Sequence, residues 1–254
     1  YALSVLNALY RWLIEQRYLL ANPFAGVKVK GGKRVAALDA QRGFSSHEWS
    51  LVRSVAEAIE WTADWSEPAA QRLRFLLDFW FGTGLRPHEM VGARLGHIRR
   101  DDHGDDWLQV VGKGHKEGEV AVPTSTMGAL DRYLAQRGLP TTRSRWDPKA
   151  PLLPALEGAG SVTTARLWVV LRRFFDDAAD QLQVTSPGTA EKLRRATPHW
   201  LRHTHATHAL AAGADLTTVR DNLRHASIAT TSVYLHTDQA KRAAQMRKAF
   251  AAAR

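Results

Sequence analysis

The sequence predicts a mainly α-helical fold with one small antiparallel sheet of three strands, an α+β class. Apolar residues recur at helical spacing over most of the 254 residues, and this period indicates amphipathic helices. Only residues 97–123 carry β-rich runs around a glycine-rich turn. The composition, 44% apolar and 24% charged, is that of a globular protein large enough to bury a core. It excludes a disordered tail, a collagen and a coiled coil.

The first segment, residues 1–26, carries one predicted helix at 2–20, which Asn22 and Pro23 end. A single amphipathic helix cannot bury its own apolar stripe. Since the chain begins with Tyr1 rather than Met, we expect a longer protein whose preceding segment covers this stripe. The stripe consists of Leu3, Leu6, Leu9, Tyr10, Leu13 and Ile14.

A basic linker is predicted at residues 27–43, where two glycines stand among cations. Such a linker can lie along a phosphate backbone. A solvated loop is the alternative, and the pattern leaves both open. The cations are Lys28, Lys30, Lys33 and Arg34.

A second domain is predicted at residues 44–236, beginning where Ser45 and Ser46 offer helix caps. Its helices are predicted at about 46–60, 68–82, 124–137, 161–183, 198–212, 215–223 and 227–235. Its strands are predicted at His97–Arg100, Trp107–Val111 and Glu119–Val122. An Ala/Lys/Arg-rich helical tail follows at 237–254.

The charge balance favours a polyanionic partner. The chain has 35 Lys+Arg against 25 Asp+Glu, a net charge of +10, which is typical of proteins that bind nucleic acid or an anionic membrane. A protein that is simply basic is the alternative. The chain has no cysteine, which excludes disulfides, thiol nucleophiles and Cys-based zinc sites and is compatible with a reducing cytosol. The longest apolar stretch, Leu73–Leu85, is too short to span a bilayer, and no signal-peptide pattern is present.

The first candidate motif is Gly84-Leu85-Arg86-Pro87-His88-Glu89, which follows an apolar helix. It is neither a P-loop nor a dinucleotide fingerprint, because no Gly-Lys-Ser/Thr ends it and no strand precedes it. Glu89, three residues after Arg86, is placed to hold that arginine in position. An ordinary surface arginine is the alternative.

A second motif, Thr197-Pro198-His199-Trp200-Leu201-Arg202-His203, reads as a helix start with Thr as N-cap and Pro at the first helical position. His199 and Arg202 then share one face of the first turn, where a helix N-terminus favours an anion. The sequence therefore predicts a phosphate site. A metal site formed by the histidines is the rival, disfavoured because no His-Glu-x-x-His is present and an adjacent arginine repels a cation. In the structural alternative, His203, His205 and His208 only satisfy hydrogen bonds.

A third motif, Leu223-Arg224-His225, precedes Tyr234 by nine residues from the histidine. With Gly112-Lys113-Gly114 and the two motifs above, it makes residues 44–240 resemble the catalytic domain of the tyrosine recombinases, the phage-integrase and Xer-like family. Residues 1–26 resemble the last helix of that family's core-binding domain. The family usually has glycine where Arg224 stands, which affects the turn into the helix at 227–235.

The resemblance implies that Tyr234 attacks a DNA phosphodiester, giving a 3′-phosphotyrosine and a free 5′-hydroxyl. Arg86 and Arg202 would clamp the non-bridging oxygens. Lys113 would protonate the leaving oxygen, and His199 would act as base or hydrogen-bond partner of the phenol. No metal and no nucleotide cofactor is required. Further implied roles are a hydrogen bond from His225 to the phosphate, support by Glu89 and His203, and DNA contacts by Lys28, Lys30, Lys33, Arg34 and Lys116.

The partners implied are double-stranded DNA and further copies of the chain, in a tetramer joined through the tail 237–254. The tail helix packing on its own domain is the alternative. A cytoplasmic bacterial protein, nucleoid-associated or encoded by a mobile element, is expected, acting in integration, excision or resolution. The rival functions are type IB topoisomerase-like strand relaxation, a non-catalytic DNA-binding accessory protein and a metal-dependent nuclease.

Overall fold

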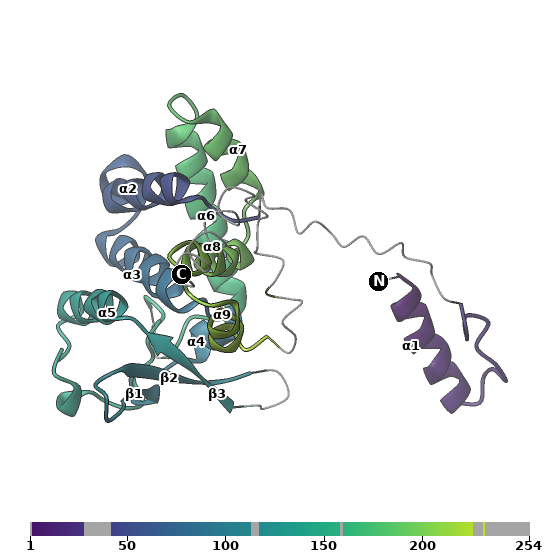
Figure 1. Cartoon of the computed structure of the whole chain (residues 1–254). Helices are drawn as coiled ribbons and strands as arrows, with labels where there is room; N and C mark the ends of the chain where they lie inside the picture. The colour runs from purple at the N-terminus through teal and green to yellow at the C-terminus, as the bar shows by residue number, and fades with distance from the viewer. Residues whose placement is uncertain (1, 28–41, 113–116, 158–159, 226–230, 232–254) are drawn as a thin grey trace, which may run out of the picture. The chain divides into compact units, whose positions relative to one another are not determined.

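The computed structural model describes residues 2–27, 42–112, 117–157, 160–225 and 231. The chain divides into two compact units, Tyr1–Ala37 and Leu38–Arg254 (Figure 1). Several predicted features lie outside the described residues: the linker cations Lys28, Lys30, Lys33 and Arg34, the residues Lys113, Lys116 and Tyr234, the helix at 227–235 apart from Thr231, and the tail 237–254.

The first unit holds one helix, α1 (Ala2–Glu15), which ends earlier than the sequence pattern predicts. Arg17 adopts a left-handed φ of 60°, and Tyr18 donates its backbone N–H back into the last turn at 2.9 Å. This hydrogen bond satisfies a carbonyl group at the end of the helix. Asn22, predicted to end the helix, instead donates from Nδ2 to Asn7 Oδ1 at 2.8 Å. None of the described side chains of this unit is buried, as expected for a lone amphipathic helix.

The second unit is helical with one sheet, which confirms the predicted α+β class. The elements are α2 (Ser46–Thr62), α3 (Glu67–Thr83), α4 (Pro87–Gly92), β1 (Ile98–Arg100), β2 (Asp106–Val111), β3 (Glu117–Val122), α5 (Thr124–Gln136), α6 (Thr164–Leu182), α7 (Pro187–Arg195), α8 (Pro198–Ala211) and α9 (Leu216–Leu223), with 3₁₀ turns at Leu95–His97 and Arg143–Arg145. The sequence pattern missed α4, whose six residues are too few to display an apolar period. It also missed α7, which begins with Pro187 and Gly188, a dipeptide typical of a turn. None of the described helices has both the length and the apolar character needed to cross a bilayer.

The central helix of the core is α3, which packs against α2, α5 and α8. Trp80 is fully buried and donates from Nε1 to the carbonyl of Leu85 at 2.6 Å, which fixes the loop after α3. Gly84 closes α3 with a left-handed φ of 61°. A Cβ at Gly84 would lie 2.5 Å from His205 Cδ2, so this position requires glycine for both conformation and space.

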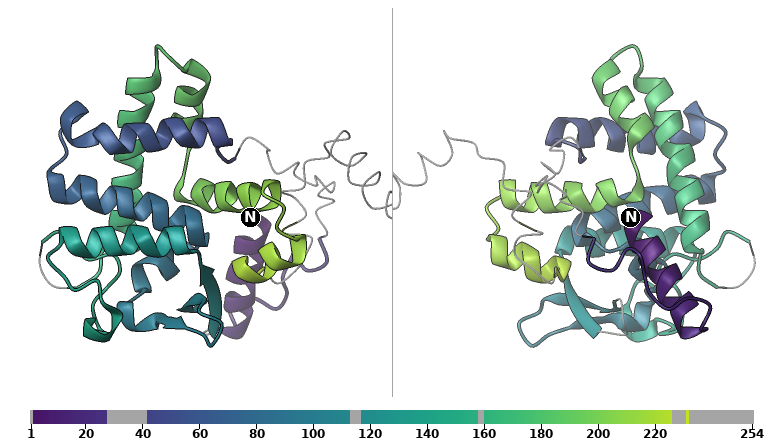
Figure 2. Two further views of the ribbon diagram at one scale, coloured as in Figure 1. Left: turned by 60° about the vertical axis from the view of Figure 1, so that its left-hand side comes forward. Right: turned by 90° about the vertical axis from the view of Figure 1, so that its right-hand side faces the viewer.

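The sheet has the order β1-β2-β3, with antiparallel neighbours. It lies at one end of the second unit, and α7 lies at the other, packed against α6 (Figures 1 and 2). Leu108 pairs with Ile98 on one side and with Val120 on the other, and all three side chains are buried. The end of α9 is attached to β3, because Ala121 donates its N–H to Asn222 Oδ1 at 2.8 Å.

Candidate active site

Arg86 lies between α3 and α4, and Glu89 on α4 holds it in place. Glu89 Oε1 accepts a hydrogen bond from Arg86 Nη1 at 2.9 Å, and Oε2 accepts one from the Arg86 backbone N–H at 2.7 Å. The contact suggested by the three-residue spacing is therefore present. The Glu89 side chain is 0% exposed, whereas that of Arg86 is 30% exposed. The guanidinium of Arg86 thus stays accessible to an anion from solvent.

Arg202, on α8, has a different setting because the residue is only 6% exposed. Its Nη1 donates to the carbonyl of Gly84 at 2.6 Å, and its Nη2 donates to the carbonyl of Leu223. These bonds connect the loop after α3 to the end of α9. Arg202 therefore contributes to the packing of the site as well as to its charge.

The two arginines converge on the backbone just before His225. Arg202 contacts the carbonyl of Leu223, and Arg86 Nη2 donates to the next carbonyl, that of Arg224, at 3.2 Å. Nδ1 of His225 lies 2.8 Å from the Thr231 hydroxyl oxygen. The structure thus brings together three residues that are far apart in the sequence and that the motifs predicted for one site.

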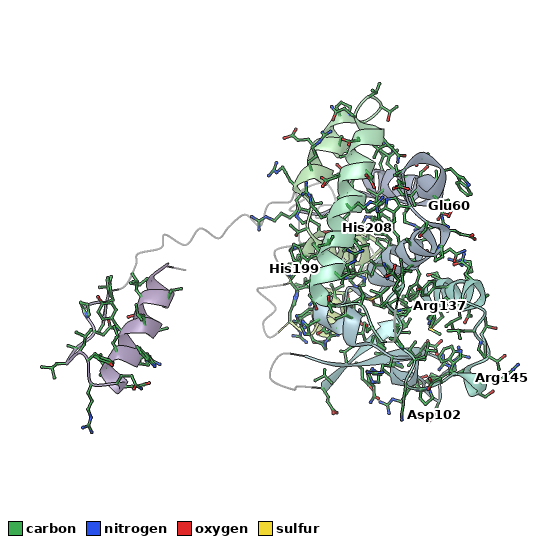
Figure 3. All side chains as sticks on the ribbon, turned by 180° about the vertical axis from the view of Figure 1, so that it is seen from behind. Glu60, Asp102, Arg137, Arg145, His199 and His208 are labelled. Carbon is green, nitrogen blue, oxygen red and sulfur yellow. The ribbon has the colours of Figure 1, made fainter. Side chains whose placement is uncertain are left out.

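Two further predicted residues, His199 and His203, lie on the first turns of α8. Thr197 occupies the N-cap as predicted, although its side chain makes no capping hydrogen bond. His199 lies at the surface (Figure 3), with its ring edge-on to Trp168 at a centroid distance of 6.3 Å. A pocket of about 380 Å³ adjoins it, lined by Arg42, Arg195, Thr197, His199, Trp200 and His203.

The electrostatics of this region favour neutral histidines. Desolvation, Arg202 and Arg86 together lower the pKa of His199. The same three causes, in the same order, bring the pKa of His225 to about 4. Desolvation, followed by the charges of His199 and Arg202, brings the pKa of His203 to about 4. At neutral pH each ring is therefore able to accept a proton or a hydrogen bond, and the arginines carry the positive charge.

His205 and His208 make the hydrogen bonds expected of histidines that have only a structural role. Nδ1 of His205 lies 2.7 Å from the carbonyl oxygen of Phe81, and Nε2 of His208 lies 3.2 Å from that of Phe44. Among the described residues, no group of three or more His, Cys, Asp or Glu could hold a metal ion.

Acid is expected to destabilise the protein through three histidines, namely His203, His205 and His225, whose pKa values burial lowers to about 4. The unfolded chain takes up these protons near pH 6.5, so stability is lost as the pH falls from 6.5 towards 4. Between pH 7 and pH 5 the loss is at most about 2 kcal/mol for the buried His205. It is smaller for His203 and His225, which are partly exposed, so that solvent screens their charge.

Urea unfolding at pH 7 and pH 5 measures this loss together with that of other groups titrating in the same range, so a variant that lacks one of the three histidines is compared with the wild type. The variant His205→Asn keeps a side-chain N–H donor for the Phe81 carbonyl but does not titrate. Between pH 7 and pH 5, the free energy of unfolding of this variant should fall by less than that of the wild type. The difference should equal the contribution of His205. A decline equal to that of the wild type would contradict the prediction.

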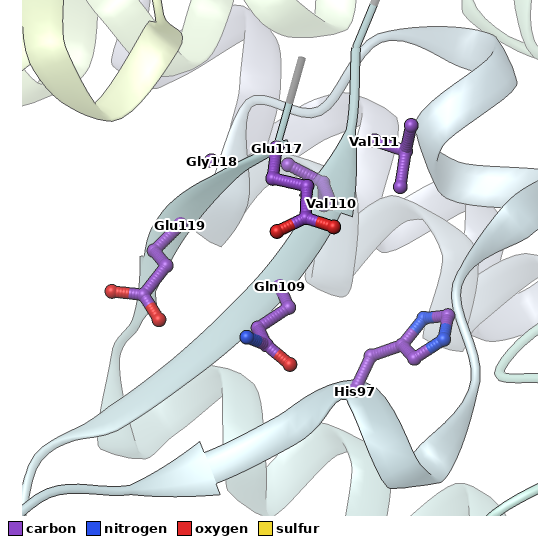
Figure 4. A pocket seen from close by; sticks show the side chains of 7 residues that line it. All are labelled: His97, Gln109, Val110, Val111, Glu117, Gly118 and Glu119. Atoms are coloured by element: carbon purple, nitrogen blue, oxygen red, sulfur yellow. The ribbon is translucent and has the colours of Figure 1, made fainter. Parts of the chain in front are cut away.

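A second hollow, of about 390 Å³, lies on the sheet and has the opposite electrostatic character. His97, Gln109 and Glu117 face it (Figure 4). Glu119, also in its lining, forms an ion pair with Arg99. The two carboxylates disfavour a phosphate here, whereas the pocket beside His199 is lined by arginines and histidines.

Sequence reasoning missed three arginines of the site region: Arg42, Arg195 and, as a residue with a role, Arg224. Neither the Arg42 nor the Arg195 side chain forms a hydrogen bond or ion pair with a described residue. The basic last turn of α7, which ends in Arg195, is the one signal that could have indicated this surface. Lys113, Lys116 and Tyr234 lie outside the described residues. The strands on either side of residues 113–116 are held in register by the pairing of Val111 with Glu117.

Comparison with known proteins gives one consistent family. Residues 51–241 match the profile of the phage integrase family. Tyrosine recombinase XerC of Yersinia pestis is 31% identical over 237 residues, which are 93% of this chain and 67% of XerC. XerH site-specific recombinase bound to palindromic difH substrate, a post-cleavage complex, superimposes with a TM-score of 0.61 at 22% identity, covering 87% of this chain and 58% of that one. A lambda integrase tetramer bound to a Holliday junction gives 0.58 at 16% identity, covering 92% and 58%. The chain thus spans little more than half the length of these two solved chains.

Proposed function

The chain belongs to the phage integrase family of tyrosine-type site-specific recombinases, and from this premise we propose that it cuts and rejoins DNA through a 3′-phosphotyrosine on Tyr234. The observation that carries the proposal is the convergence of Arg86 and Arg202 on the two carbonyls before His225. This arrangement suits a phosphodiester, whose transition state gathers negative charge on its non-bridging oxygens.

The proposed reaction is a balanced exchange of two phosphoester bonds. The Tyr234 phenol oxygen attacks phosphorus and passes its proton to His199, and the P–O5′ bond breaks as Lys113 protonates the leaving oxygen. A 5′-hydroxyl of the partner strand reverses both steps and rejoins the DNA. The lowered pKa of His199 keeps its imidazole neutral, and so able to accept the phenolic proton.

Binding of duplex DNA is supported by charge. The net charge is +10, and release of counterions from DNA contributes much of the affinity of such a surface. Arg42 and Arg195, in the pocket beside His199, would contact backbone phosphates next to the one that reacts. We assign the same role to Lys28, Lys30, Lys33, Arg34 and Lys116.

Covalent trapping tests the proposal. The protein is mixed with a nicked duplex carrying its recombination site at low salt with a chelator, denatured, and examined for protein-linked DNA. We expect an adduct on the peptide that contains Tyr234, and none from Tyr234→Phe, which keeps the ring but lacks the nucleophile. Loss of the adduct on chelation would instead support a metal-dependent nuclease. Relaxation of supercoils by a monomer, without strand exchange, would support a topoisomerase-like enzyme.

Assembly on DNA is the second part of the proposal. We propose a tetramer joined by the tail 237–254, acting in the cytoplasm on the bacterial nucleoid or on a mobile element. The tetrameric state of the related lambda integrase on a Holliday junction supports this stoichiometry.

Deleting residues 240–254 should abolish strand exchange between two duplexes while DNA binding persists, because single-subunit binding needs no tail contact. Gel-shift titration and a two-duplex exchange assay measure the two activities separately. Exchange that survives the deletion would favour a tail that packs on its own domain.

A further inference from the structure

Arg224 ends α9 in a backbone conformation that residues other than glycine rarely adopt. Its φ is 52°, in the left-handed region, and the only other described non-glycine residue with positive φ is Arg17. A strained backbone persists when the surrounding contacts compensate for it, so the contacts of the Arg224 side chain indicate what it contributes.

These contacts connect three segments. Arg224 Nη2 donates to Glu89 Oε2 at 2.5 Å, and Nη1 donates to the carbonyl of Asn222 at 3.1 Å. The aliphatic part lies over Gly118 of β3, where a Cβ would be 2.5 Å from Arg224 Cδ. Gly118 follows the first residue of β3, close in sequence to residues 113–116, which lie outside the described residues. Arg224 thus links the end of α9 to α4 and to the hairpin.

We propose that Arg224 is a positioning residue for DNA cleavage, which completes the charge around Glu89 and thereby fixes the guanidinium of Arg86. The part that concerns the rate rests on the proposed function. Two arginines share one buried carboxylate: Glu89 Oε1 binds Arg86 Nη1, and Oε2 binds Arg224 Nη2 together with the Arg86 backbone N–H. Without Arg224, half of the charge that keeps this carboxylate ionised is missing.

Protonation of Glu89 gives a signature that a merely structural residue would not produce. Burial raises the pKa of Glu89, but the Arg86 backbone N–H and the charge of Arg224 outweigh burial and lower it below its usual value. Among the described residues, the charged or titratable groups that face this carboxylate are Arg86, Arg224 and, at 4.0 Å, His88. When Arg224 is replaced by a neutral residue, its charge and its hydrogen bond no longer oppose the effect of burial, so Glu89 protonates at a higher pH than in the wild type. The protonated side chain then loses an acceptor for Arg86.

Three variants test the proposal: Arg224→Met keeps the stem over Gly118, Arg224→Gly relieves the backbone, and Arg224→Lys keeps the charge. Single-turnover adduct formation is measured from pH 5.5 to 8 on saturating nicked duplex, together with DNA affinity. We expect Met and Gly to lower the rate about ten- to a hundredfold at unchanged affinity, as a displaced catalytic group does. The acid limb of their pH profiles should move to higher pH, and Lys should restore both rate and profile. A rate reduced equally at every pH, or a Lys variant no better than Met, overturns the proposal.

A second measurement separates failure of this proposal from failure of the proposed function. A double-mutant cycle of Arg224→Met and Glu89→Gln, read by thermal unfolding without DNA, reports whether the two side chains are coupled. Additive effects of the two substitutions overturn the contact itself. The wild type could form no Tyr234 adduct while the cycle shows coupling. In that case the proposed recombinase mechanism fails, together with the positioning role of Arg224 in it. Only the contact between Arg224 and Glu89 is then supported.

Discussion

Replacing Arg86 with alanine is expected to lower the rate of adduct formation by about 10³–10⁵-fold, the effect of removing an arginine from other phosphoryl-transfer sites, with little loss of stability. The Arg86 side chain is 30% exposed, so its removal opens no large cavity. Its buried partner Glu89 keeps Arg224 and the backbone N–H of residue 86. The loss is therefore one of transition-state stabilisation rather than of folding.

Single-turnover trapping measures the loss of cleavage rate, and thermal unfolding measures the loss of stability. Arg74→Ala is the matched control, because Arg74 also forms an ion pair at 2.9 Å, with Glu60, and is 16% exposed, but lies outside the site. We expect the control to lose at least as much stability as Arg86→Ala and to keep its cleavage rate. Equal rates for Arg86→Ala and the wild type would remove Arg86 from the mechanism.

Replacing Arg202 with methionine is expected to abolish adduct formation and also to destabilise the domain by about 2–6 kcal/mol. The substitution takes the donors from two carbonyls, those of Gly84 and Leu223. Each unsatisfied buried polar group costs about 1–3 kcal/mol. Because these bonds connect the loop of Arg86 to the backbone before His225, the site loses both its charge and its geometry.

Arg72 is the control for Arg202, since both residues are 6% exposed. Arg72 donates to the carbonyl of Pro154 at 3.1 Å, away from the site. Arg72→Met should lower the melting temperature but leave the cleavage rate unchanged at temperatures where the variant is folded. Arg202→Lys should recover part of the stability without the rate, because lysine offers no planar fork. If Arg202→Met melts like the wild type, the structural role of Arg202 is wrong.

Much of the fold follows from local pattern. Most helices and all three strands occur where periodicity and turn residues predict them. The exceptions have local causes. Helix α1 ends early because Arg17 adopts a left-handed conformation, α4 is too short to show a period, and α7 begins with a Pro-Gly pair that is typical of a turn. Strand β3 begins at Glu117 rather than at the predicted Glu119, because backbone pairing requires no apolar side chain.

The candidate site, like the fold, is predicted by the sequence only in part. The spacing of Arg86 and Glu89, or of His199 and Arg202, places the members of each pair together through one helical turn, and the sequence predicts this without a fold. It also indicates the nucleophile, the charge of the site and the class of substrate through the resemblance of its motifs. The two pairs follow from residue type and short separation, whereas the nucleophile and the class of substrate are implied by the resemblance alone.

The sequence did not reveal that the two arginines differ or that Arg224 belongs to the site. Arg202 is buried because it meets carbonyls 118 and 21 residues away, whereas the Arg86 side chain remains partly exposed. Arg224 reaches Glu89, 135 residues away, and its stem fits over β3 because residue 118 is glycine. Burial and long-range hydrogen bonds arise only when α3, α8, α9 and the sheet pack together, and no local pattern contains that information.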